Sequence, residues 1–185
     1  MKKFYVICLI FMSMIFSGYK MTEEYIIDSE QNAYIHNNLG LKYLKENQYY
    51  PAMEEFKIAI SLSPETQASA VFYNNLGEVY MKLERPDLAQ DCFERALRQY
   101  SLNFRYYLNL ADCYYKLGFA DTQIAHSKKD TNPLGLVLRG LLYEKKGQNI
   151  LAITTLDEFV AKEPDLIITD AVKKHIKKLV ETTYK

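Results

Sequence analysis

Pairs of adjacent residues that end in glycine or alanine recur at regular intervals along the chain. Each pair is followed by a tyrosine one helical turn later. The pairs are Leu39-Gly40, Leu76-Gly77, Leu110-Ala111 and Arg139-Gly140. The tyrosines that follow them are Tyr43, Tyr80, Tyr114 and Tyr143. A spacing of three or four residues between residues of one kind is typical of one helix face. The pattern therefore predicts a chain of helices built from one repeated unit.

A second group of small and aromatic residues follows in the first two copies, with the spacing i, i+4, i+7 of a second helix. These residues are Ala52, Phe56 and Ala59 in the first copy and Ala89, Phe93 and Ala96 in the second. We predict hairpins in which glycine and alanine let two antiparallel helices approach, with the aromatic rings beside them. The predicted helices span 33–46, 51–62, 68–83, 86–99, 104–117, 119–128, 133–146 and 149–162, after a short helix within 21–32.

These residues resemble the tetratricopeptide repeat, a helical hairpin of about 34 residues. The resemblance covers residues 33–166 as four copies, 33–66, 70–103, 104–132 and 133–166. The third copy is degenerate, because its second helix is about one turn short and lacks the alanine and phenylalanine signature. The resemblance implies an all-α, right-handed superhelical solenoid of antiparallel helix pairs.

Apolar residues between Leu166 and Val180 form one stripe, and several lysines lie on the opposite face. This pattern predicts a C-terminal helix within 167–185. A solenoid needs a terminal helix with one polar face to cover its last apolar surface, so we interpret this helix as a cap. The alternative is a basic amphipathic helix that lies on anionic lipid.

The N-terminus has the pattern of a secretory signal. Lys2 and Lys3 precede an uncharged stretch of 13 residues, 4–16, which is shorter than the ~20 apolar residues of a transmembrane helix. We predict a signal peptide at 1–17 and a short segment at 18–32, and hence an exported protein that is periplasmic or secreted. The alternative is an uncleaved membrane anchor that leaves the repeats outside the cytoplasm.

Composition narrows the classes of function. The 23 basic and 23 acidic side chains balance, which gives no field to attract nucleic acid. His36, His126 and His175 lie far apart, and the sequence has no phosphate-binding loop or nucleophile motif. We expect no enzyme activity, cofactor, metal or small-molecule substrate. In one interpretation Cys92 and Cys113 form a disulfide bond. In the other interpretation both are unbonded core residues.

The candidate binding residues lie on the first helix of each copy, which in the tetratricopeptide family lines a concave surface that takes a partner peptide. Asparagines recur two residues before the second member of three pairs, and lysines recur near the end of all four helices. An amide can hydrogen-bond to the backbone of an extended segment, and lysine pairs with a carboxylate. The predicted groove residues are Asn38, Lys45, Asn75, Lys82, Asn109, Lys116, Leu141 and Lys145.

Each of these residue types also has a structural interpretation. Asparagine and lysine are common in the repeat itself, and a lysine near a helix C-terminus complements the helix dipole. Leu138 and Leu141 suit either an apolar anchor of a partner or packing of the terminal helix.

We interpret the protein as a non-catalytic interaction scaffold in a bacterial cell envelope. It binds an extended and carboxylate-bearing segment of a partner protein, and it contacts a membrane only if the signal is uncleaved. Two alternatives are a self-associating structural solenoid and a membrane-anchored accessory subunit of an envelope complex.

Overall fold

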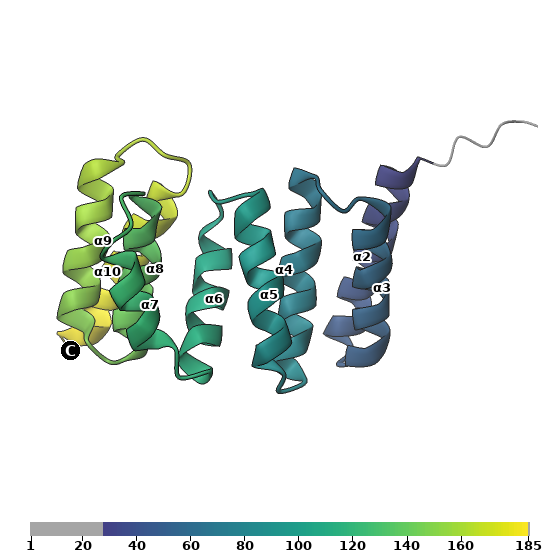
Figure 1. Ribbon diagram of the computed structural model, residues 1–185, viewed down its shortest axis with the longest axis horizontal. Coiled ribbons are helices and arrows are strands. Elements are labelled where there is room, and N and C mark those ends of the chain that lie inside the picture. The colour runs from purple at the N-terminus through teal and green to yellow at the C-terminus, as the bar shows by residue number, and fades with distance from the viewer. Residues whose placement is uncertain (1–27, 185) are drawn as a thin grey trace, which may run out of the picture.

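The computed structural model describes residues 28–184, which form nine helices and no strand. The helices are α2 (Ser29–Lys45), α3 (Tyr49–Leu62), α4 (Gln67–Lys82), α5 (Pro86–Gln99), α6 (Phe104–Lys116), α7 (Ala120–Ser127), α8 (Leu134–Lys145), α9 (Asn149–Lys162) and α10 (Thr169–Thr183). Figure 1 shows them side by side along the long axis of the molecule, with α2 and α3 at one end and α9 and α10 at the other. The predicted all-α solenoid with a terminal cap is confirmed, and its right-handed sense stays a prediction.

Part of the predicted N-terminal organisation lies outside the described residues. This holds for the signal peptide, 1–17, and for most of the segment 18–32. The first repeat helix begins at Ser29 rather than at 33, because the Asp28 side chain accepts a hydrogen bond from the Gln31 N–H at 3.0 Å. Residues 29–32 are therefore the first turn of α2 and do not end a separate short helix. Between Asp28 and Tyr184 no helix is long and apolar enough to cross a membrane.

Each helix pair turns through one residue with left-handed backbone, namely Asn47, Glu84, Gly118 or Gly147, with φ values of 58, 57, 76 and 73°. The next N–H in each turn donates to the carbonyl of the repeating tyrosine at 2.8 to 2.9 Å. The four bonds run from Gln48 to Tyr43, Arg85 to Tyr80, Phe119 to Tyr114 and Gln148 to Tyr143. This is the bond that closes a Schellman C-cap, so the repeating tyrosines also mark the helix ends.

In each of the first two helix pairs, a glycine of the first helix lies against a phenylalanine ring of the second helix. A Cβ atom on Gly77 would lie 2.5 Å from Cε1 of Phe93, and one on Gly40 would lie 2.6 Å from Cε1 of Phe56. Both rings are buried. The prediction that the glycine faces the alanine of the second helix is therefore corrected: Ala89 is buried, but the ring itself covers Gly77. Only glycine fits at this distance.

The third pair departs from this arrangement. Ala111 and Ser127 occupy the positions of the glycine and the phenylalanine, so there is neither a close approach nor a ring to fill it. As predicted, α7 is short, with 8 residues against 14 in α5. It packs more on α8 than on α6, and α6 packs directly against α8.

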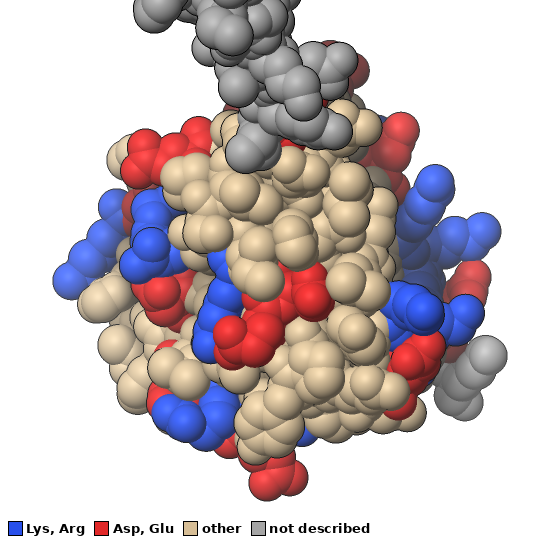
Figure 2. Space-filling view, turned by 90° about the vertical axis from the view of Figure 1, so that its right-hand side faces the viewer, with Lys and Arg blue, Asp and Glu red and all other residues tan. Residues whose placement is uncertain are grey.

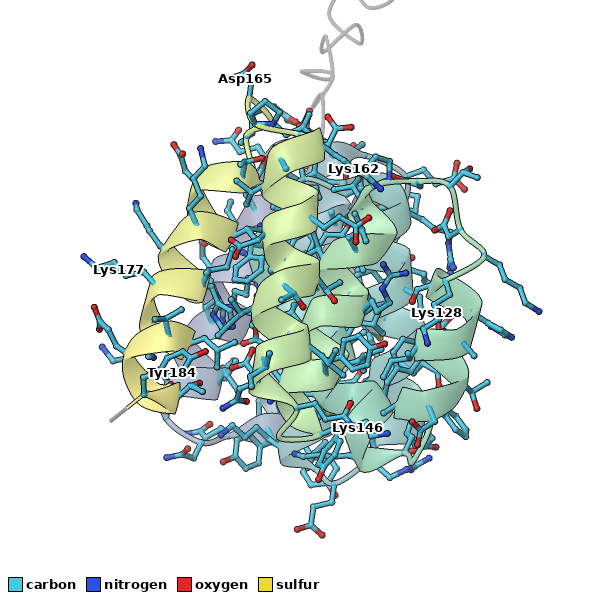
Figure 3. The ribbon with its side chains drawn as sticks, turned by 90° about the vertical axis from the view of Figure 1, so that its left-hand side faces the viewer. Lys128, Lys146, Lys162, Asp165, Lys177 and Tyr184 are labelled. Carbon is cyan, nitrogen blue, oxygen red and sulfur yellow. The ribbon has the colours of Figure 1, made fainter. Side chains whose placement is uncertain are left out.

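The C-terminal end is capped by α10, which packs against α9 (Figure 3). Val172 and Ile168 are buried in the largest hydrophobic cluster, which extends without interruption from α5 to α10. Lys177 points away from the neighbouring helices (Figure 3). Three smaller clusters hold α2 to α6 together.

Candidate peptide-binding site

The predicted asparagines form hydrogen bonds between repeats. Asn75 is 4% exposed, and its Nδ2 donates to Oδ1 of Asn37 at 2.8 Å. In the next repeat, Nδ2 of Asn109 donates to Oδ1 of Asn74 at 2.8 Å. The prediction that Asn75 is available for a partner's backbone is therefore wrong, because its amide is buried and holds α2 and α4 together.

Asn38 occupies the same position in the first repeat, but no earlier repeat precedes α2 within residues 28–184, and its side chain is exposed. In the fourth repeat the position is Leu138, and Leu108 stands where Asn37 and Asn74 stand earlier. The asparagine pairs thus join the first three repeats, whereas apolar residues replace them at the junction of the third and fourth.

Leu141 is not available for a partner either. It is 1% exposed and lies in the same hydrophobic cluster as Ile168 and Val172, at the start of α10 and one turn further along. Its prediction as a groove residue is corrected, and the alternative interpretation, packing of the terminal helix, describes its surroundings.

The four predicted lysines fall into two groups. Lys45 and Lys82 are exposed and make no ion pair or hydrogen bond with any side chain between residues 28 and 184. Lys145 donates to Oδ1 of Asp112 at 2.7 Å, and Lys116 lies 3.5 Å from Oδ2 of the same carboxylate. Burial alone raises the pKa of Asp112, but the bond from Lys145 and the two ammonium charges outweigh it and lower that pKa. The carboxylate therefore keeps its charge and forms ion pairs with both lysines, so neither lysine is without a partner.

A cavity of about 240 Å³ lies between α4 and α6, and we name it the α4–α6 cavity. It is lined by Glu78, Met81, Lys82, Phe93, Arg105, Asn109 and Asp112. Arg105 donates to the Glu78 carboxylate at 2.8 Å, and Asn109 donates to it at 2.9 Å. Lys82 is the cation of this cavity whose charge is not already matched within the described chain.

Sequence reasoning found Lys82 and Asn109 but missed the three charged residues beside them. Glu78 and Asp112 each follow directly after Gly77 or Ala111, on the helix stripe that carries the asparagines, since Asn74 and Glu78 are four residues apart. The acidic residue after the second and third repeating pairs was therefore the available signal. Arg105 had no such signal, because its role depends on the contact with Glu78 from another repeat.

The remaining polar candidates do not gather into a reactive site. His36 pairs with Glu55 and His175 with Glu144, each at 2.6 Å, in different parts of the array. Cys92 and Cys113 are free, and burial raises the pKa of both thiols to about 12, so both stay protonated. Within the described part of the chain, no group of three or more histidine, cysteine or acidic side chains stands ready to hold a metal ion. The α4–α6 cavity offers ion pairing and hydrogen bonding.

The fold and this cavity define a helical-repeat protein with a polar site between two repeats. In the comparison with known proteins, residues 68–129 match the family model of the tetratricopeptide repeat. A stretch of 70 residues is 31% identical to the tetratricopeptide repeat domain-containing protein PYG7, chloroplastic, of Arabidopsis thaliana. That match covers 38% of this chain and 22% of the relative, so this chain spans about a fifth of its length.

Two solved structures show the same fold at low sequence identity. The crystal structure of MamA protein has a TM-score of 0.52 at 16% identity and covers 82% of this chain and 91% of that one. A tetratricopeptide repeat protein from Parabacteroides merdae has a TM-score of 0.52 at 17% identity and covers 82% of this chain and 61% of that one. The fold is that of a tetratricopeptide-like solenoid.

Proposed function

We propose that this protein is a non-catalytic scaffold that binds an extended, acidic segment of a partner protein at the α4–α6 cavity. The observation that carries this proposal is the charge of Lys82, which lines the cavity without a partner among residues 28–184. A carboxylate of the partner that approaches Lys82 also comes near Arg105, which already pairs with Glu78, so Lys82 is the main contact. Charge-assisted hydrogen bonds to a carboxylate are stronger than hydrogen bonds between neutral groups.

The position of Asp112 favours Lys82 over Lys116 and Lys145 as the residue that binds the partner's carboxylate. Lys116 and Lys145 share the Asp112 carboxylate, so a partner's acidic group that came to them would have to compete with it. Lys45 lies one repeat away from Lys82, at the end of α2, and is likewise exposed and without an ion pair among residues 28–184. The segment therefore runs from the α4–α6 cavity toward the first repeat.

The cellular setting of this scaffold is proposed from residues 1–17 alone. Their lysine start and apolar stretch support export to a bacterial envelope, where the protein is periplasmic or secreted. The intact mass of the native protein tests this proposal. A mass that lacks about 17 residues supports export, and one that includes Met1 on cytoplasmic protein contradicts it.

Self-association is the second candidate function, and the first repeat favours it. Ile35 and Tyr50 are 55% and 68% exposed on α2 and α3. Figure 2 shows this end of the molecule, where residues that are neither acidic nor basic cover most of the visible surface. Sedimentation distinguishes the two candidates, because a scaffold for another protein stays monomeric at micromolar concentration.

The experiment for the leading proposal compares two end-blocked pentapeptides that differ only in charge, Ac-Gly-Asp-Gly-Asp-Gly-NH₂ and its asparagine counterpart. At low salt we expect the acidic peptide to bind about threefold to tenfold more tightly, and we expect 0.5 M salt to remove most of the difference. Lys82→Gln should abolish the preference. Lys178→Gln, an exposed lysine on α10, is the matched control and should leave it intact. Equal affinity for the two peptides, or an unchanged preference in Lys82→Gln, contradicts the proposal.

A further inference from the structure

A second and larger cavity, of about 450 Å³, adjoins the α4–α6 cavity, and Arg105 lines both. We name it the α6–α10 cavity, because it lies between the start of α6 and the start of α10. Its apolar lining comes from Leu102, Phe104, Leu108, Ile167, Ile168 and Ala171. The two cavities therefore offer a polar and an apolar surface on either side of one arginine.

The terminal helix builds one wall of this cavity and is held in place there. Nε2 of His175 lies 2.6 Å from a carboxylate oxygen of Glu144 on α8. The His175 ring also packs at 61° against the ring of Phe104, with 5.2 Å between their centroids. These contacts hold α10 against both α6 and α8, and with them the connections before α6 and α10 that supply the rest of the lining.

Ile167 lies at the rim of the α6–α10 cavity and is 75% exposed, the largest exposed fraction among the large apolar residues of 28–184. It stands next to Ile168, which is buried, at the turn that leads into α10. An exposed apolar residue beside an apolar cavity leaves surface in contact with water that a partner's side chain can cover.

We propose that the α6–α10 cavity receives one large aliphatic or aromatic side chain of the same acidic segment that binds at Lys82. This inference rests on the proposed function, since it places a second anchor of that segment. The stem of Arg105 separates the two anchors, with its guanidinium on the Glu78 side. The segment has an apolar residue close to an aspartate or glutamate, so that both cavities fill at once.

Charge complementarity selects a partner's segment as the occupant. The α6–α10 cavity shares Arg105 with the α4–α6 cavity, and Lys82 lines the α4–α6 cavity, so a segment with an apolar residue and a nearby carboxylate matches the two surfaces. The specificity that follows is for apolar and acidic residues in close succession.

Four end-blocked pentapeptides test this inference by adding the two anchors separately. They are Ac-Gly-Leu-Gly-Asp-Gly-NH₂, its Leu→Ala form, its Asp→Asn form and the form with both changes. The wild-type chain should bind the peptide with both leucine and aspartate most tightly. Replacing the leucine by alanine should lower the affinity about threefold to tenfold. Isothermal titration or NMR shifts of the Leu102–Leu108 amides measure the affinities.

Two variants of the cavity separate the anchors. Ala171→Leu fills the α6–α10 cavity, and Ile167→Ser removes its rim; both should remove the preference for leucine and keep the preference for aspartate. Ile150→Ser is the matched control, because Ile150 is 64% exposed on α9 and lines neither cavity. It should change neither preference.

The other possible outcomes show whether the apolar anchor or the proposed function is wrong. Preference for aspartate without any gain from leucine overturns the apolar anchor and leaves the proposed function standing. Absence of binding by all four peptides overturns both. Sedimentation of wild type as a dimer that Ile167→Ser dissociates means that a second copy occupies the cavity, and the inference is then wrong.

Discussion

The second helix pair, α4 and α5, and the third, α6 and α7, solve the same packing problem in different ways. In the second pair a phenylalanine ring lies on a glycine, and α5 runs for 14 residues along its partner. In the third pair Ala111 and Ser127 take those positions, and α7 runs for 8. The difference teaches that the glycine and the ring act as one unit: when both are lost, the short helix moves to the next repeat and α6 packs on α8.

The turns show the opposite trend. The regular first two pairs turn through Asn47 and Glu84, which are left-handed without being glycine, whereas the last two turn through Gly118 and Gly147. A left-handed conformation costs an L-residue about 1–2 kcal/mol. The well-packed second pair thus tolerates a less favourable turn at Glu84, whereas the irregular third pair has a relaxed turn at Gly118.

The largest expected effect comes from the ring of the second pair. Phe93→Ala should lower the free energy of unfolding by about 3–5 kcal/mol, because it removes a buried ring and leaves a cavity over Gly77. Ser127→Ala at the corresponding position of the third pair should change it by less than about 1 kcal/mol. Urea unfolding of both variants checks the contrast, and similar losses would mean that the two positions pack alike.

The glycine of the same unit gives the next effect. Gly77→Ala should destabilise by about 1–3 kcal/mol, although alanine is the better helix former, because its Cβ would meet the Phe93 ring at 2.5 Å. Ala111→Gly in the third pair should also destabilise, by about 1–2 kcal/mol, through lower helix propensity and the loss of a buried methyl group. A Gly77→Ala protein as stable as wild type would show that the ring can move aside.

Asn75→Ala tests the bond between the first two repeats. It leaves Oδ1 of the buried Asn37 without its donor, so we expect a loss of about 1–3 kcal/mol in the free energy of unfolding. The exposed Asn38 is the matched control, and Asn38→Ala should change stability by less than about 0.5 kcal/mol. Thermal unfolding of the two variants decides the point; equal melting temperatures would contradict a structural role for Asn75.

The smallest effect is a gain at the second turn. Glu84→Gly should raise the free energy of unfolding by about 1 kcal/mol, since glycine adopts its φ of 57° without the Cβ clash. Gly118→Ala in the third pair should lower it by a similar amount, despite the open space around that residue. A Glu84→Gly variant that is less stable than wild type would show that the side chain contributes more than its backbone strain costs.

The sequence predicts the fold well because the repeat depends on local spacing. All eight repeat helices were predicted within a few residues, since prolines and the glycine and tyrosine positions mark their ends. The short α7 was also predicted, from the missing alanine and phenylalanine.

Prediction of the site was weaker, because the partners of its residues lie in other repeats. Asn75 and Leu141 share the helix stripe of Lys82, but spacing within one helix does not show that Asn37 and α10 cover them. Asp112 likewise changes the role of Lys145 from a distance of 33 residues along the chain. Which members of a stripe stay free is decided by contacts between repeats.

The uneven distribution of the core predicts where the molecule opens first. In an array that contacts only its neighbours, an end unit can detach at the cost of one interface. The α2–α3 pair packs only on α4 and α5 among the described helices, whereas α8 is enclosed by α6, α7 and α9 in the cluster that runs to α10. Amide hydrogens of α2 and α3 should therefore exchange through local opening, while those of α8 exchange only when the larger block unfolds. A protease added to the native protein should cut the first repeat before any other.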